Sequence, residues 1–242
     1  MEITSGMVKV PAANGAMSAS LSRPTAGGTY PGVVVVQEAF GLNAHIKDVA
    51  ARIAGEGYVT LAPDLYYRET NAVVGYDNLP EAIRLMMGLT DDNIVKDMGA
   101  AIAYLQQQPG VRADRIGVTG FCMGGRVTFL TACLNPAVKA AVPFYGGGIG
   151  SARPPAPAPL DHADKLTGAV LLFYGDQDGF IPLEEVERIK TRLAVAKKDA
   201  EVVVYRGADH GFFCNERASY HAESAKDAWG RMLTFFAKYL KA

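Results

Sequence analysis

The stretch that decides the fold reads Gly120-Phe121-Cys122-Met123-Gly124, and it directly follows a predicted strand at 115–119. It matches the G-x-S-x-G turn between a strand and a helix, with cysteine in place of serine. Such a turn strains the backbone of its central residue and leaves room only for glycine on either side. The pattern therefore predicts a nucleophilic Cys122 above a strand end, where the N-terminus of the next helix favours a thiolate.

The competing interpretation of Cys122 is a buried structural cysteine beside a glycine-rich turn. The preceding strand and the flanking glycines favour the nucleophile. Cys133, by contrast, lies one helix length later among apolar residues and is expected in the core. The third cysteine is Cys214, and three scattered cysteines without a C-x-x-C pair predict no disulfide framework and no zinc site. A reduced, intracellular setting fits them.

Outward from this turn, strands alternate with helices in both directions. A hairpin is predicted at 7–11 and 16–21 around Asn14-Gly15, and Gly32-Val33-Val34-Val35-Val36 indicates a strand covered on both faces. Further strands are predicted at 58–61, 115–119, 138–144, 169–174 and 201–205, with helices near 43–56, 79–89, 91–108, after Cys122 and at 220–241. This alternation predicts an α/β fold: a doubly wound, mainly parallel sheet of about eight strands flanked by helices.

The last helix, at 220–241, carries apolar residues at helical spacing. Trp229, Leu233, Phe236 and Leu240 recur on one face, so we expect that face to be buried.

Composition limits the classes of function. The 242 residues, 49% of them hydrophobic and 20% charged, predict a single globular domain over 1–242. A formal net charge of −1 provides no broad attraction for nucleic acid or anionic membranes, so neither partner is expected. The sequence shows no apolar run of about 20 residues and no secretory pattern at its start, which predicts a cytoplasmic protein.

An acid is expected where the strand at 169–174 ends, because functional groups collect at the carboxyl ends of parallel strands. The chain continues there as Gly175-Asp176-Gln177-Asp178. We predict Asp178, rather than Asp176, as the acid that orients a catalytic histidine. Either aspartate could instead be a turn residue or a helix cap.

The base is predicted to be His210, in the loop Gly207-Ala208-Asp209-His210-Gly211 after the last strand. The other histidines are expected to be solvated: His45 in a surface helix, His162 in a polar loop and His221 near the start of the last helix. None of the histidines has a zinc-ligand spacing supported by a third ligand, so no metal is predicted.

Together these motifs resemble the dienelactone hydrolase (carboxymethylenebutenolidase) family of α/β-hydrolases over essentially the whole chain. The resemblance rests on several stretches in order: Gln37-Glu38-Ala39-Phe40-Gly41-Leu42-Asn43, Ala62-Pro63-Asp64-Leu65-Tyr66, the cysteine turn, Phe144-Tyr145-Gly146, and the Asp178 and His210 loops. It implies hydrolysis of an ester or lactone through Cys122, His210 and Asp178.

The resemblance also implies that Glu38 takes the thiol proton of Cys122 when substrate binds, since a thiol is mostly protonated at pH 7. The alternative for Glu38 is a surface acid; if buried, it needs a partner such as a thiol or an arginine. The N–H groups of Ala39 and Met123 would form the oxyanion hole. An acyl-thioester would then be released by water that His210 activates, with no cofactor.

Substrate recognition departs from the family pattern. Members that act on dienelactone use two arginines for the substrate carboxylate, and Arg84 is a candidate for the first. The second is missing, because Cys214 stands four residues after His210, although Arg217 could substitute. Both arginines could equally be ordinary surface cations. Tyr145 and Phe40 are further candidates for substrate contact.

Three functions therefore remain open. The leading one is dienelactone-hydrolase-like opening of an ester or lactone. A carboxylesterase or thioesterase of different substrate range would use the same triad. A non-catalytic binding or redox-sensing protein would keep Cys122 as an oxidisable thiol, although it would need neither Asp178 nor the glycines. The chain is expected to be a monomer or a small homo-oligomer that binds a small-molecule substrate.

Overall fold

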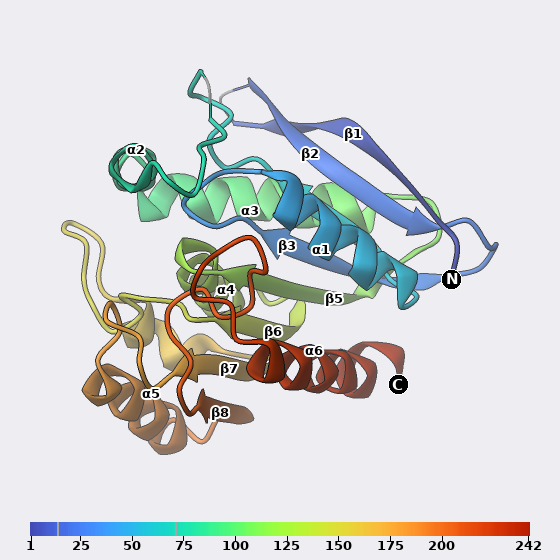
Figure 1. The fold of residues 1–242 in the computed structure, drawn as a ribbon. Helices are drawn as coiled ribbons and strands as arrows, with labels where there is room; N and C mark the ends of the chain where they lie inside the picture. The colour runs from blue at the N-terminus through green and yellow to red at the C-terminus, as the bar shows by residue number, and fades with distance from the viewer. Residues whose placement is uncertain (14, 71) are drawn as a thin grey trace.

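An eight-stranded sheet runs through the molecule in the order β1-β2-β4-β3-β5-β6-β7-β8 (Figure 1). The structure is a computed structural model that describes residues 1–13, 15–70 and 72–242. The strands are β1 (Ile3–Ala12), β2 (Gly15–Pro24), β3 (Tyr30–Val36), β4 (Val59–Pro63), β5 (Val111–Phe121), β6 (Val138–Phe144), β7 (Ala169–Gly175) and β8 (Ala200–Tyr205). The doubly wound, mainly parallel sheet predicted from the sequence is confirmed.

The sheet combines an antiparallel edge with a parallel centre. β1 pairs with β2 and β2 with β4 in antiparallel register, whereas β4, β3, β5, β6, β7 and β8 are parallel neighbours. The hairpin predicted at the amino end is therefore present, with longer strands than expected. Its predicted turn falls on Asn14, which lies outside the described residues.

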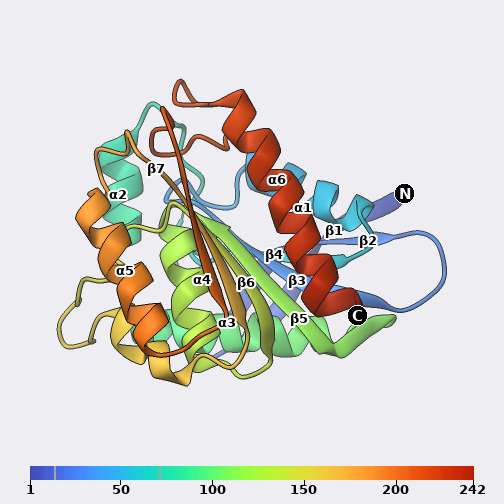
Figure 2. The same cartoon turned by 90° about the horizontal axis from the view of Figure 1, so that it is seen from below.

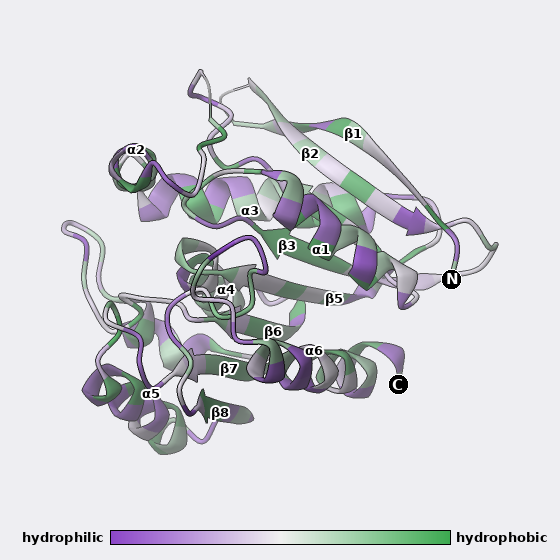
Figure 3. Ribbon diagram, in the orientation of Figure 1, coloured by the Kyte–Doolittle hydropathy of each residue, from purple (hydrophilic) through white to green (hydrophobic). Residues whose placement is uncertain are grey.

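Helices cover both faces of the sheet. Figure 2 shows α1 (Ala44–Gly55) and α6 (Ala222–Phe236) on one side, with α3 (Asp91–Gln106), α4 (Met123–Leu134) and α5 (Leu183–Val195) on the other. The short α2 (Leu79–Met87) precedes α3, a 3-10 helix spans Pro159–Lys165, and a π-helical turn at Ala237–Lys241 extends α6. This double cover explains why all four valines of Val33–Val36 are fully buried, and Figure 3 shows β3 as a hydrophobic ribbon.

Side-chain caps set where two of these helices begin. The Oδ1 atom of Asn43 accepts from the N–H of Ile46 at 3.0 Å ahead of α1, and Thr90 accepts from the N–H of Asn93 at 3.2 Å ahead of α3. Each cap satisfies an N–H group that the first helical turn leaves unpaired.

The closing helix buries a different face from the one predicted. Phe236 and Leu240 are fully buried as expected, but Trp229 and Leu233 are only half-buried. The guanidinium of Arg52, on α1, lies 4.2 Å from the centroid of the Trp229 ring, on α6, and this cation–π contact joins the two helices near the surface.

The strand ends decide where chemistry can occur. Glu38 follows β3, Cys122 follows β5, Tyr145 follows β6, Asp178 follows β7 and His210 follows β8. Because these five strands are parallel, their carboxyl ends lie at one edge of the sheet. In the described part of the chain, no helix has the length and apolar character needed to cross a membrane.

Candidate active site

Cys122 occupies the strained turn that its sequence context predicts. Its backbone has φ 56° and ψ −120°, in the region that residues with a side chain rarely adopt. A Cβ on Gly124 would lie 2.5 Å from the carbonyl oxygen of Gln37, and one on Gly120 would collide with the carbonyl of Gly124. The flanking glycines are therefore sterically required. Cys122 is half-buried, whereas Cys133 is buried in the core as expected.

Asp178, not Asp176, pairs with the histidine. The Oδ2 atom of Asp178 lies 2.8 Å from Nδ1 of His210, and both side chains are almost fully buried. The other carboxylate oxygen, Oδ1, accepts from the N–H groups of Phe180 at 2.9 Å and Ile181 at 3.2 Å. Asp176 instead accepts from the N–H of Gly207 at 2.7 Å and so acts as the turn residue.

The surroundings of His210 favour its protonated form. Burial lowers its pKa, but the adjacent Cys122 sulfur, followed by the hydrogen bond that the imidazole donates to Asp178, outweighs burial and raises the pKa to about 10. A hydrogen bond between His210 and Cys122 is part of this balance. The rings of Tyr145 and Phe180 each lie 5.2 Å from the imidazole in edge-on orientation. The imidazole thus bridges the thiol and the carboxylate.

Glu38 is fully buried, so the alternative of a surface acid is wrong. Its Oε1 atom lies 3.4 Å from Nη1 of Arg217, and its Oε2 atom accepts from the hydroxyl of Tyr76 at 2.9 Å. A buried carboxylate needs such partners because burial removes its hydration. Of the two partners that the sequence suggested, thiol or arginine, the structure provides the arginine.

The two candidate arginines have different surroundings. The side chain of Arg217 is 18% exposed, and its guanidinium lies over the rings of Phe40 and Tyr76, 5.6 and 5.8 Å from their centroids. Arg84 lies on α2 with 54% of its side chain exposed, and it pairs with Glu81 and Glu69. The structure therefore brings Arg217, and not Arg84, into contact with the other candidate site residues.

The groups predicted for the oxyanion hole come from two adjacent turns. Met123 is the first residue of α4, whose N–H has no partner inside the helix. Ala39 lies in a turn closed by the bond from Gly41 N–H to the Glu38 carbonyl at 3.2 Å, which does not use the Ala39 N–H. The hydroxyl of Tyr66 links the two turns, lying 3.1 Å from the Ala39 carbonyl and 3.5 Å from the Met123 sulfur.

Tyr145 and Phe40, the two aromatic residues predicted to contact substrate, lie beside His210 and Arg217 respectively. Tyr145 is fully buried with a positive φ of 36°, and its hydroxyl has no hydrogen-bond partner among the described residues. Burial, reinforced by the charge of Glu38, raises the pKa of Tyr145 well above its ordinary value, so the phenol stays neutral. Phe40 is 3% exposed and packs edge-on against Tyr76, with 4.6 Å between ring centroids.

The prediction for His45 is wrong. Its side chain is buried, with the rings of Phe121 and Phe213 each 6.4 Å away, and burial lowers its pKa. It lies in the first turn of α1, which packs against aromatic residues next to the cysteine turn and the His210 loop. His162 and His221 are partly exposed, as expected, and His221 lies 2.7 Å from the hydroxyl of Ser224.

The sequence predicts that the segment between Tyr66 and Asp92, with Tyr67, Arg68, Tyr76 and Arg84, lines or covers the site, although no periodicity fixes its path. It does not predict a role for Phe180. Within the segment, Tyr76 contacts Glu38, whereas Tyr67 and Arg68 bond to Asp97 on α3. Phe180 is 67% exposed and lies beside His210. The only sign of it in the sequence is indirect: it follows Asp178 by two residues.

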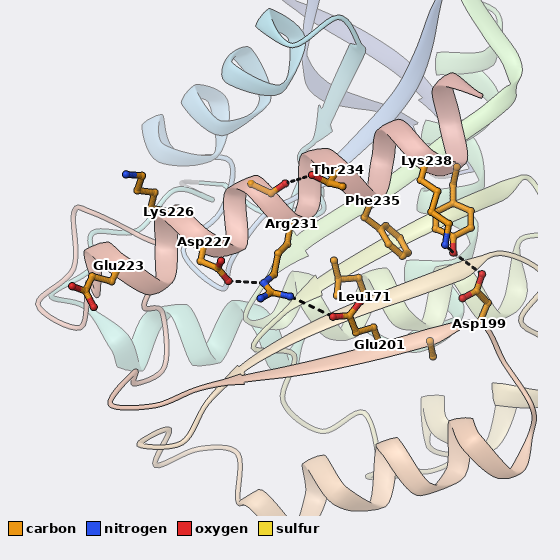
Figure 4. A pocket seen from close by; sticks show the side chains of 13 residues that line it. Leu171, Asp199, Glu201, Glu223, Lys226, Asp227, Arg231, Thr234, Phe235 and Lys238 are labelled. Carbon is orange, nitrogen blue, oxygen red and sulfur yellow. Dashed lines mark hydrogen bonds and ion pairs between the residues drawn. The ribbon is translucent and has the colours of Figure 1, made fainter.

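Two other kinds of site are conceivable among the described residues. In the ranges that the structure describes, no group of three or more His, Cys, Asp or Glu side chains could hold a metal ion. A hollow of about 970 Å³ between α6 and β8 contains none of the residues above (Figure 4). Among its charged groups, Arg231 pairs with Asp227 and Glu201. We therefore assign it no chemistry.

The sheet order and the strained turn at its centre define an α/β-hydrolase. A crystal structure of a dienelactone hydrolase from Klebsiella pneumoniae, described there as putative, superposes with a TM-score of 0.91 at 40% identity, covering 99% of this chain and 100% of that one. Proteins of Synechocystis and Salmonella typhimurium, both named "Putative carboxymethylenebutenolidase", are 41% and 40% identical over 100% and 98% of this chain, and over 99% and 88% of their own lengths.

The sequence model of the dienelactone hydrolase family matches residues 17–240. The chain belongs to the dienelactone hydrolase family.

Proposed function

We propose that this hydrolase opens an ester or lactone bond with Cys122 as nucleophile, His210 as base and Asp178 as the acid that orients the imidazole. The single observation that carries the proposal is the 2.8 Å contact between Asp178 and His210, whose imidazole also feels the charge of the neighbouring, strained Cys122. A redox-sensing thiol would need neither the Asp178–His210 pair nor glycines at the two positions of the turn where a Cβ would collide with the backbone. A redox-sensing role is therefore less well supported.

The reaction proceeds in two steps. The proton of Cys122 passes to Glu38, the sulfur attacks the carbonyl carbon, and an acyl-thioester forms. The leaving alkoxide takes a proton from the imidazolium of His210, which leaves this histidine neutral for the second step. The N–H groups of Ala39 and Met123 face the developing oxyanion; donors of this kind lower the barrier by about 2.7–4 kcal/mol each. Water activated by His210 then hydrolyses the thioester. The proposed scheme uses no cofactor in either step.

Glu38 takes the thiol proton in this proposal. In the free protein its Oε1 atom is engaged by Arg217 at 3.4 Å. A substrate that carries a carboxylate competes for the same guanidinium, because planar arginine binds carboxylates through paired hydrogen bonds. Drawing Arg217 toward the substrate would free Oε1 for the Cys122 proton. Activation of the thiol is then coupled to arrival of an anionic substrate.

Two substrate classes follow from the two arginines. Carboxylated lactones are favoured by Arg217, and the name carboxymethylenebutenolidase of the relatives describes such a compound. The position of Arg84 instead favours simple carboxylic esters or thioesters. It pairs with Glu81 and Glu69 at the surface, so that of the two candidate arginines only Arg217 lies next to Glu38. Tyr145, Phe40 and Phe180 would contact the acyl part in either case.

The test replaces Cys122 with alanine and measures hydrolysis of a short p-nitrophenyl ester and of a dienelactone. We expect loss of both activities, whereas Cys133→Ala, the same change at a buried cysteine of α4, keeps them. Cys122→Ser is expected to be impaired, because a hydroxyl is a weaker acid than a thiol. Unchanged turnover in Cys122→Ala would rule out the proposed nucleophile.

The setting of the enzyme also stays a proposal. All three cysteines are free, which fits the reducing cytoplasm expected from the sequence. A single domain over 1–242 and a monomer or small homo-oligomer remain predictions.

A further inference from the structure

The hydroxyl of Tyr76 joins three polar groups from separate parts of the chain. It lies 2.9 Å from Oε2 of Glu38, 3.0 Å from Nδ2 of Asn43 and 3.2 Å from Sγ of Cys214. Glu38 follows β3, Asn43 caps α1, and Cys214 lies four residues after His210. A single phenol therefore connects the proposed proton acceptor to the loop of the proposed base.

The direction of each hydrogen bond can be assigned. The Oδ1 atom of Asn43 already accepts from the N–H of Ile46, so its amide nitrogen must face Tyr76 and donate. Burial, followed by the charge of Glu38, raises the pKa of Cys214 to about 11, so this side chain is a thiol that donates as well. Burial and the same carboxylate also raise the pKa of Tyr76 well above its ordinary value.

Two donors thus fill the acceptor positions of the Tyr76 oxygen. The phenolic proton has one remaining acceptor, Oε2 of Glu38, and points to it. Because this bond goes to a carboxylate, it is stronger than a bond between neutral groups.

The segment that carries Tyr76 is fastened to the turn that carries Glu38. The N–H of Val74 donates to the carbonyl of Phe40 at 3.0 Å, and the ring of Phe40 packs edge-on against Tyr76. Gly41 lies so close to the carbonyl of Ala72 that no side chain would fit there. The phenol and the carboxylate therefore belong to one packed unit.

The two oxygens of Glu38 differ in the kind of partner they have. Oε2 bonds to the neutral, doubly anchored phenol of Tyr76, whereas Oε1 faces the guanidinium of Arg217, at the longer distance of 3.4 Å. The arginine is partly exposed and rests on aromatic rings, so it can exchange partners without breaking a backbone contact.

We infer that Tyr76 is the positioning residue of Glu38: it keeps Oε2 in place while Oε1 exchanges Arg217 for the Cys122 thiol and receives its proton. The inference rests on the proposed role of Glu38. In the step itself the S–H bond of Cys122 breaks, an O–H bond forms at Oε1, and the sulfur keeps the electron pair for attack on the carbonyl. Tyr76 loses no proton and touches no reacting atom.

The first test is Tyr76→Phe, which removes the hydroxyl and keeps the ring. We expect kcat for a dienelactone, whose carboxylate can draw Arg217 away from Glu38, to fall about 10- to 100-fold, as for a misplaced catalytic group, with KM changed less than about 3-fold. The matched control is Tyr205→Phe, which deletes a phenol that donates to the carboxylate of Asp227 at 2.7 Å, between the edge strand β8 and α6. The control is expected to keep the parent kcat.

A double-mutant cycle separates positioning from a general structural effect. If Tyr76 acts through Glu38, adding Tyr76→Phe to Glu38→Gln costs less than about 2-fold in kcat, because the group being positioned is already gone. An equal loss in the parent and in the Glu38→Gln background would overturn the inference, and so would parent-like kcat in Tyr76→Phe. Denaturant midpoints of all variants report folding independently.

Cys214 supplies a second variant if Tyr76→Phe folds poorly. Cys214→Ala removes one donor to the phenol and is expected to lower kcat, whereas Cys214→Ser restores a donor and is expected to recover most of it. Recovery no better than in the alanine variant would contradict the hydrogen-bond assignment. Cys122→Ala separates failure of this inference from failure of the proposed function. If Cys122→Ala keeps its turnover, the proposed function is refuted. If Cys122→Ala is inactive but Tyr76→Phe has the parent kcat, only the role of Tyr76 is refuted.

Discussion

Arg126 and Asp91 form a bidentate ion pair in the interior, with Nη1–Oδ1 at 2.6 Å and Nη2–Oδ2 at 2.8 Å. Arg126 lies four residues after Cys122 on α4, and Asp91 is the first residue of α3. The Nε atom of Arg126 also donates to the carbonyl of Gly148 at 3.3 Å. The pair thus ties the helix behind the cysteine turn to its neighbour and to the loop after β6.

Breaking this pair should destabilise the protein strongly. Arg126→Ala leaves Asp91 buried without a partner, which we expect to lower the free energy of unfolding by about 3–5 kcal/mol. Urea denaturation measures the change. The matched control is Lys96→Ala, which breaks the exposed pair with Asp92 on the same α3 and should cost less than about 1 kcal/mol. Similar losses in both variants would contradict the argument from burial.

Two helical glycines should respond to alanine in opposite directions. Gly124→Ala, in α4, forces a methyl group to 2.5 Å from the Gln37 carbonyl, so we expect a less stable protein with impaired turnover. Gly99→Ala, in α3, has no atom within 4 Å of the new Cβ and should stabilise the fold by about 0.5–1 kcal/mol through helix propensity. Thermal unfolding and ester hydrolysis measure both. A stabilised Gly124→Ala would refute the steric requirement.

The pKa of His210 should depend on both of its neighbours. We expect an NMR titration of the imidazole to give a pKa near the value of about 10 in the parent and a lower one in Cys122→Ala and in Asp178→Asn. The reason is that each substitution removes a neighbour that raises the pKa of the imidazole. A pKa unchanged by both substitutions would show that the imidazole faces neither group.

The same shift predicts how stability varies with pH. The folded pKa of His210 lies above the value of about 6.5 for an exposed histidine, so the folded state binds the proton more tightly. The resulting stabilisation is complete below pH ~6.5 and is lost as the pH rises toward about 10. The difference in unfolding free energy between the parent and His210→Asn should therefore shrink over this window. A difference that grows with pH would contradict the sign.

The arginines should separate carboxylated from uncarboxylated substrates. For Arg217→Ala we expect kcat/KM to fall about 10-fold or more for a dienelactone and much less for a p-nitrophenyl ester, because a charge-assisted contact with the carboxylate is lost. Arg84→Ala, at an exposed position paired with acids, should leave both substrates within about 2-fold. Equal losses for both substrates in Arg217→Ala would argue against recognition of an anion.

Much of the arrangement was predictable because it depends on local pattern. The four valines of β3 indicated a covered strand, and the cysteine turn placed a reactive side chain at a strand end. The preference for Asp178 over Asp176 also agrees with the contact to His210. Catalytic roles for these residues stay predictions until the variants are measured.

Other features depended on how distant segments pack. His45 was expected in solvent, yet α1 turns it toward the rings of Phe121 and Phe213, which lie far away in the sequence. Arg84 looked equivalent to Arg217 in the sequence, but its neighbours Glu81 and Glu69 hold it at the surface. The burial of His45 has no local signal, because contacts across the fold set it, whereas the pair between Arg84 and Glu81 lies within one turn of α2.

The sequence by itself determined the order of strands and helices, the glycine-flanked cysteine turn and the loops that bear an acid and a histidine, since periodicity and steric limits act between near neighbours. Only the tertiary structure decided which arginine meets Glu38 and where the hydroxyl of Tyr76 points. Those pairings arise because buried charges and donors must find partners, and folding brings the partners from distant parts of the chain.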